Sequence, residues 1–134
     1  MVDERFERDV RNLGAALMRL DGALSEPETS AQRCENTADA FNGVMDMFWI
    51  VARKALEIRG VQARLPRQAV QAACENGWIT DPAPWLEMLK AEYELSGTRD
   101  PLMTRRLYPR IQEYHPELRR AHDLIVAEMQ KDLT

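Results

Sequence analysis

Residues 66–98 read PRQAVQAACENGWITDPAPWLEMLKAEYELSGT, and this stretch holds the clearest helix start and stop signals of the chain. Pro66 suits the first turn of a helix, and Asn76-Gly77 predicts its end. Asp81 can cap a second helix that has Pro82 at its first position. Apolar residues at helical spacing continue this second helix to about residue 97, namely Trp85, Met88, Leu89 and Leu95.

Two longer helices are predicted on the N-terminal side of this stretch. Pro27 and its Ser/Thr-rich neighbours end the first helix, and Gly60 ends the second in the left-handed conformation. Between about Ala31 and Arg59 the apolar residues cover more than one stripe, as expected for the central helix of a bundle. A narrow seam with alternating four- and three-residue steps marks the first helix: Phe6, Val10, Leu13, Leu17, Leu20 and Leu24.

A further helix is predicted on the C-terminal side, starting at Asp100-Pro101. Pro109 is expected to kink it and Pro116 to break or restart it, because each proline removes a backbone donor. Helical spacing returns over residues 118–133. Since all connections are short and no β-type alternation occurs, the sequence predicts an all-α, antiparallel up-and-down bundle of four to five helices.

The composition is that of one compact domain spanning residues 1–134, with 45% hydrophobic and 30% charged residues. No apolar run reaches about 18 residues and no signal-peptide order is present, so we expect a cytoplasmic protein that does not enter the membrane. A net charge of -4 argues against general nucleic-acid binding. Cys34 and Cys74 are expected to be buried, reduced thiols, and no metal or cofactor is indicated.

The opening stretch resembles the nucleotidyltransferase substrate-binding proteins of the HEPN superfamily. Their pattern joins a Pro-Arg start and a Gly-aliphatic-Ile stop to Trp-Leu-x-Met-Leu-x-x-Arg-Asn-x-x-x-His-x-Tyr. The chain keeps the start, the stop and the Trp-Leu-x-Met-Leu run between Pro66 and Lys90. In the preceding helix Phe41 and Trp49 match the family, whereas Asp46 replaces a glutamate.

The functional positions of that pattern hold different residues here. In the family the Arg and His form an RNase pair, and a partner nucleotidyltransferase silences some members by adding AMP to the Tyr. The Arg, Asn, His and Tyr positions are occupied by Glu92, Tyr93, Gly97 and Arg99. Glu92 would repel a phosphate, Gly97 has no side chain for proton transfer, and Arg99 cannot accept AMP. We therefore expect no catalytic residue.

The resemblance implies a homodimeric bundle that works beside a minimal nucleotidyltransferase encoded nearby, as in toxin–antitoxin pairs. The interpretation is a catalytically inactive accessory or substrate-binding subunit that binds the partner enzyme or its nucleotide. Two alternatives remain open: an RNase or AMP-accepting toxin with relocated active residues, and a purely structural or antitoxin-like dimeric module. The broad apolar coverage of residues 31–59 also suggests a face for a second subunit.

Three arginines are the first candidates for binding. Arg99, Arg105 and Arg106 flank the start of the helix predicted at Pro101, where free amides and the helix dipole favour anions. This indicates a site for a phosphate or an acidic partner. The alternative is a solvated face with ordinary salt bridges.

A second candidate set is formed by Asp46, Glu92 and Tyr93. Asp46 lies in an apolar stretch, so its carboxylate must face water or find a partner. Glu92 and Tyr93 occupy aligned positions of the family motif. Aromatic residues are more often found in the core, and that expectation applies to Trp78, Trp85 and Tyr93 alike.

The histidines give weaker signals. Arg110 and His115 repeat the Arg-x4-His spacing away from the aligned motif, a match that arises readily by chance in a chain with so many arginines. His115 and His122 are seven residues apart, whereas zinc-binding histidines on one helix usually lie four apart. Solvated or locally bonded histidines are expected.

Overall fold

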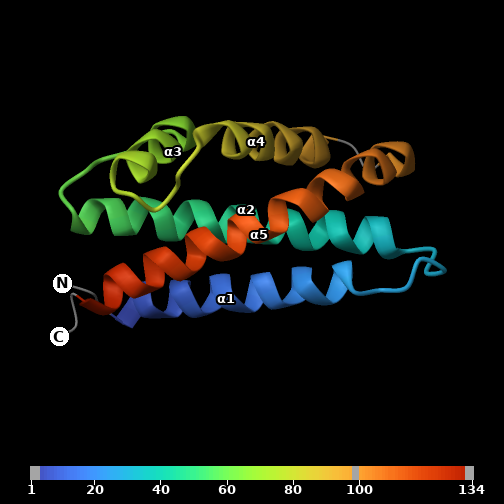
Figure 1. The fold of residues 1–134 in the computed structure, drawn as a ribbon, viewed down its shortest axis with the longest axis horizontal. Coiled ribbons are helices and arrows are strands. Elements are labelled where there is room, and N and C mark those ends of the chain that lie inside the picture. The colour runs from blue at the N-terminus through green and yellow to red at the C-terminus, as the bar shows by residue number, and fades with distance from the viewer. Residues whose placement is uncertain (1–3, 98–99, 132–134) are drawn as a thin grey trace.

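The computed structural model of the protein describes residues 4–97 and 100–131. Within these ranges the chain forms helices and no strands, so the predicted all-α class is confirmed (Figure 1). The elements are α1 (Glu4–Leu24), α2 (Arg33–Ile58), α3 (Pro66–Glu75), α4 (Pro82–Gly97) and α5 (Pro101–Lys131).

Helix α2 lies at the centre of the bundle and contacts each of the other four helices. Helices α1, α2, α4 and α5 alternate in direction along the chain, so α2 and α5 run the same way (Figure 1). Helix α5 crosses α1 and α2 obliquely, while α3 and α4 lie along the other side of α2. Apolar side chains from several sides of α2 are buried within this single chain. The broad apolar coverage of α2 is therefore accounted for without a second subunit.

The helix ends follow the start and stop signals of the sequence. Gly60 and Gly77 have φ of +80° and +81°, the left-handed conformation that glycine adopts without a steric penalty. Asp81 and Asp100 each accept a hydrogen bond of 3.0 Å through Oδ1 from the backbone N–H two residues later. These local bonds fix where α4 and α5 begin.

Helix α5 continues through both of its prolines, so the predicted break at Pro116 is wrong. A proline inside a helix costs about 3 kcal/mol because one hydrogen bond is lost and the ring crowds the preceding turn. Burying one large apolar side chain contributes about 1.5 to 3 kcal/mol. A buried stripe on both sides of Pro116 offsets the cost: Leu107, Ile111, Tyr114, Leu118, Ile125 and Met129.

Both cysteines are free thiols, as expected, but each is only partly buried, so the prediction of buried side chains is met only in part. Burial of part of the side chain, followed by the nearby Asp81 and Glu117 charges, raises the pKa of Cys74. None of the helices in the described ranges combines the length and the apolar character that a bilayer span requires.

Candidate functional site

A groove on the surface brings together the three residues of the second candidate set. We call it the Asp46–Glu92 groove. It has a volume of about 560 Å³ and lies between the middle of α2, the start of α3 and the second half of α4. Its lining includes Asn42, Asp46, Leu65, Leu89, Glu92 and Tyr93, together with one exposed cationic side chain, Arg67.

The chemistry of the groove centres on two facing carboxyl groups. Asp46 projects from α2 and is exposed, whereas Glu92 on α4 is half-buried. Burial raises the pKa of Glu92 to about 7, and a hydrogen bond to Asp46 and the charge of Asp46 add to the rise. The Asp46 carboxyl group is thus exposed to solvent and also hydrogen-bonded to Glu92, so both outcomes expected for it from the sequence occur together. Glu92 therefore keeps its proton until the pH approaches 7 and becomes a second carboxylate beside Asp46 only above that pH.

The rim of the groove is apolar and open to solvent. Tyr93 is 81% exposed and Leu65 is 59% exposed. Trp78 and Trp85 are buried as expected, but the expectation that Tyr93 joins the core is wrong. On a helix with 3.6 residues per turn, Tyr93 lies about 140° around the axis from the buried Met88, which turns its ring outwards.

Asn42 adds an unused hydrogen-bond acceptor to the wall of the groove. It lies one turn before Asp46 on α2. Its Oδ1 atom is buried and has no hydrogen-bond partner among the described residues. Buried polar atoms are usually paired, so this oxygen is suited to a donor supplied by another molecule.

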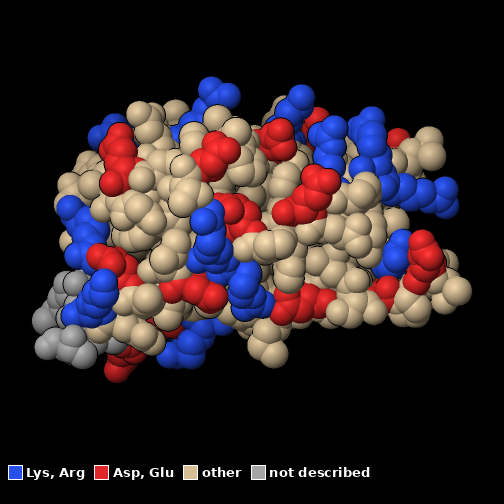
Figure 2. Space-filling model, in the orientation of Figure 1, with Lys and Arg blue, Asp and Glu red and all other residues tan. Residues whose placement is uncertain are grey.

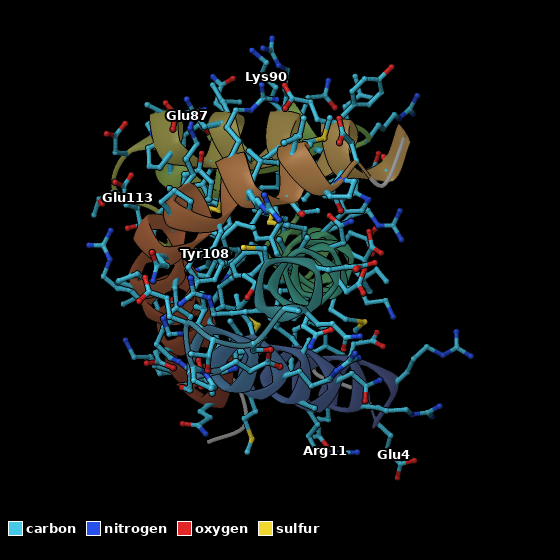
Figure 3. All side chains as sticks on the ribbon, turned by 90° about the vertical axis from the view of Figure 1, so that its right-hand side faces the viewer. Glu4, Arg11, Glu87, Lys90, Tyr108 and Glu113 are labelled. Atoms are coloured by element: carbon cyan, nitrogen blue, oxygen red, sulfur yellow. The ribbon has the colours of Figure 1, made fainter. Side chains whose placement is uncertain are left out.

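A second hollow lies at the end of the bundle where α1 connects to α2 and where α5 begins. This end faces the viewer in Figure 3, which labels Tyr108. The hollow, which we call the Arg33–Arg105 cavity, has a volume of about 720 Å³. Its lining includes Glu28, Arg33, Glu35, Arg105, Tyr108 and Gln112.

The arginine cluster predicted from sequence is only partly assembled. Arg105 lines the cavity, whereas Arg106 is exposed and does not line it, and Arg99 lies outside the described residues. Sequence reasoning missed Arg33, whose guanidinium carbon lies 4.3 Å from the centre of the Tyr108 ring. Tyr108 follows Arg105 by three residues, so its place on the same face of α5 was a signal available in the sequence.

Each of the two histidines contacts a carboxylate. His115 Nε2 contacts Asp21 Oδ1 on α1, and Arg119 Nη2 bonds the other carboxylate oxygen of Asp21 at 2.6 Å. His122 Nδ1 lies 2.9 Å from Asp123 Oδ1. No group of three His, Cys, Asp or Glu side chains within residues 4–97 and 100–131 is arranged to hold a metal ion.

The relocated Arg-x4-His pair does not form a cleft. His115 contacts Asp21 between α5 and α1, and Arg110 is exposed. Neither residue lines the groove or the cavity. At the aligned positions, Glu92 faces Asp46 and Gly97 is the exposed last residue of α4.

Comparison with known proteins places the chain in a family. No curated protein matches the sequence. A crystal structure of a protein from Thermus thermophilus superimposes with a TM-score of 0.77 at 18% identity, covering 84% of this chain and 98% of that one. At this identity the likeness shows the fold alone. Residues 8–127 match the family described as nucleotidyltransferase substrate binding protein like. Because the match spans most of the chain, the protein belongs to this nucleotidyltransferase substrate binding protein-like family.

Proposed function

We propose that this protein is a non-catalytic accessory subunit of a minimal nucleotidyltransferase, and that it contacts the enzyme through the Asp46–Glu92 groove. The family description supports the accessory role. The observation that carries the proposal is the facing pair of Asp46 and Glu92 at the place where the resemblance expects a phosphate-binding arginine. A carboxyl pair there repels an RNA phosphodiester and attracts a cation.

The chemistry of the groove favours a protein surface with a basic side chain. Asp46, Glu92 and the unpaired Asn42 Oδ1 offer hydrogen-bond acceptors to a guanidinium or an ammonium group. Tyr93 and Leu65 offer exposed apolar area around those acceptors. Polar groups surrounded by aromatic and aliphatic contacts are typical of protein–protein interfaces.

We also propose that the protein is a homodimer, as the resemblance implies. Since α2 is covered within one chain, the dimer needs another face, one that leaves the rim of the groove free for the enzyme. Light scattering at micromolar concentration should give twice the chain mass of 15.4 kDa. A 15.4 kDa particle would remove the dimer from the proposal.

The first test is binding to the nucleotidyltransferase encoded beside this chain. Glu92→Arg places a positive charge in the groove and should weaken binding by about 2 kcal/mol or more, roughly thirtyfold, as like charges then meet. Calorimetric titration of the two purified proteins measures the change. Glu94→Arg is the matched control, because Glu94 lies on the same helix outside the lining of the groove.

Two results would overturn this role. One is a wild-type protein that shows no binding to the neighbouring enzyme. The other is an equal loss of binding in Glu92→Arg and Glu94→Arg, which would assign the effect to overall charge and not to the groove.

The nuclease alternative is tested separately. The purified protein should leave single-stranded RNA and tRNA intact, because no general base stands at the aligned position. The measurement is a cleavage assay with wild type and His115→Ala. Cleavage that disappears in His115→Ala would replace the accessory role with a relocated nuclease site.

A further inference from the structure

The Arg33–Arg105 cavity brings two guanidinium groups from separate helices to one hollow. Arg33 lies in the first turn of α2, and Arg105 lies in the second turn of α5. In the orientation of Figure 1, basic side chains gather over the end of the bundle where α5 begins (Figure 2). The cavity volume of about 720 Å³ lies within the range of roughly 300 to 1,000 Å³ that small-molecule sites occupy.

Both guanidiniums are available to a ligand. Within the described residues, neither Arg33 nor Arg105 forms an ion pair, although other arginines of this chain do. Stacking over Tyr108 fixes the position of the Arg33 guanidinium and leaves its N–H groups without a carboxylate. An arginine held in place loses less side-chain freedom when it binds an anion.

The start of α2 adds to the attraction for an anion. Its N-cap residue, Gln32, makes no side-chain hydrogen bond to the first-turn amides. The residues of that first turn, Arg33, Cys34 and Glu35, line the cavity. The Arg33 N–H donates to the Ser30 carbonyl oxygen at 3.4 Å, so it is the amides of Cys34 and Glu35, together with the helix dipole, that can reinforce the two arginines.

Two carboxylates in the same lining restrict the kind of ligand. Glu28 and Glu35 are exposed and form no ion pair with either arginine. A ligand that carried only negative charge would be repelled by them. Carboxylates accept hydrogen bonds from hydroxyl groups, so they suit a ligand with hydroxyls next to its anionic group.

We propose that the Arg33–Arg105 cavity binds a phosphate monoester that carries sugar hydroxyls, such as a sugar phosphate or a nucleoside monophosphate. Arg33 and Arg105 hold the phosphate, and Glu28 and Glu35 accept hydrogen bonds from the hydroxyls. The site is separate from the Asp46–Glu92 groove, and its test needs no partner enzyme. Failure of the groove proposal therefore leaves it standing, and the reverse also holds.

The experiment is calorimetric titration of the full chain with inorganic phosphate, ribose 5-phosphate, AMP and adenosine. Ribose 5-phosphate and AMP should bind at least about tenfold more tightly than inorganic phosphate, and adenosine should not bind. Arg105→Ala should weaken binding of the two esters by at least about tenfold. Arg106→Ala is the matched control, because this neighbouring exposed arginine does not line the cavity.

Amide chemical-shift mapping by NMR places the bound ester. The shifts should move at Cys34, Glu35 and Tyr108 and stay constant at Glu92 and Tyr93. Arg33→Lys keeps the positive charge but removes the forked arrangement of guanidinium N–H donors. This variant should fold normally and bind the esters more weakly than wild type.

The proposal is overturned if none of the four probes binds at millimolar concentration, or if Arg105→Ala and Arg106→Ala lose affinity equally. It is also overturned if the shifts map to the Asp46–Glu92 groove. If AMP binds more tightly than ribose 5-phosphate, the preferred ligand is a nucleotide. If the two bind equally, the sugar phosphate is sufficient for recognition. Either result supports the site.

Discussion

The Asp46–Glu92 groove and the Arg33–Arg105 cavity are built on the same central helix, yet their charged groups differ: two carboxyl groups face each other in the groove, whereas two guanidiniums and two carboxylates line the cavity. Helix α2 supplies Asn42 and Asp46 to the groove and Arg33 to the cavity. Arg33 and Asp46 are separated by several turns and by roughly 220° around the helix axis, so they face different neighbours. One helix thus contributes to two surfaces with different charged groups.

The comparison also concerns the position at which the sequence resemblance expects a catalytic arginine. In the groove, Glu92 occupies that position and faces a second carboxyl group across the helix interface. In the cavity, guanidiniums remain available away from the aligned motif. If the cavity binds a phosphate ester as we propose, the anion-binding chemistry of this chain lies away from the aligned motif.

The largest expected effect is on stability, and it tests whether packing between α2 and α5 holds the groove and the cavity in one folded unit. Phe41 is fully buried on α2 and stacks on Tyr114 of α5, with ring centres 6.1 Å apart. Phe41→Ala should lower the free energy of unfolding by about 3 to 5 kcal/mol. Chemical denaturation measures this, with Met18→Ala as the control, because Met18 is 69% exposed. Similar stabilities for the two variants would mean that α2 and α5 are not held together by this contact.

A smaller effect sharpens the electrostatic description of the groove. Because the pKa of Glu92 is raised from 4.5 to about 7, the folded protein holds a proton that the unfolded chain releases between these values. The contribution of Glu92 to stability is therefore full below pH 4.5 and is lost as the pH rises through 7. Glu92 is partly exposed, so solvent screening reduces the effect to about 1 to 2 kcal/mol.

Glu92→Gln should remove this pH dependence and make the protein more stable than wild type at pH above 7. Urea denaturation across the acid-to-neutral range gives the two stability curves. Glu94→Gln, the control on the same helix, should change stability by less than about 0.5 kcal/mol. Parallel curves for wild type and Glu92→Gln would show that Asp46 and Glu92 do not share a proton.

The smallest expected effect concerns the arginines of α5. Replacing Arg105 and Arg106 together by Ala should change the free energy of unfolding by less than about 0.5 kcal/mol, since both are exposed and neither forms an ion pair among the described residues. Thermal denaturation followed by circular dichroism checks this. A loss of more than about 1 kcal/mol would assign these arginines a structural role and weaken the contrast between cavity and groove.

Local signals in the sequence determined most of the helix boundaries. Pro66, Asp81 and Asp100 mark helix starts, and Gly60 and Gly77 mark helix ends, because caps and left-handed glycines act within a single turn. The run between residues 66 and 90 also identified the family. These features depend on residues that are near one another in the chain, which is why one sequence suffices to find them.

Tertiary structure decided the remaining features. Helix α5 continues through Pro116 because its apolar stripe is buried on both sides of the proline. The rotation of α4 about its axis places Tyr93 on the exposed side. The pairing of Asp46 with Glu92, and of Arg33 with Tyr108, joins residues on different helices. Such contacts depend on how far each helix is rotated and shifted against its neighbours. The chain's local preferences leave that choice open, and the burial of the whole core fixes it.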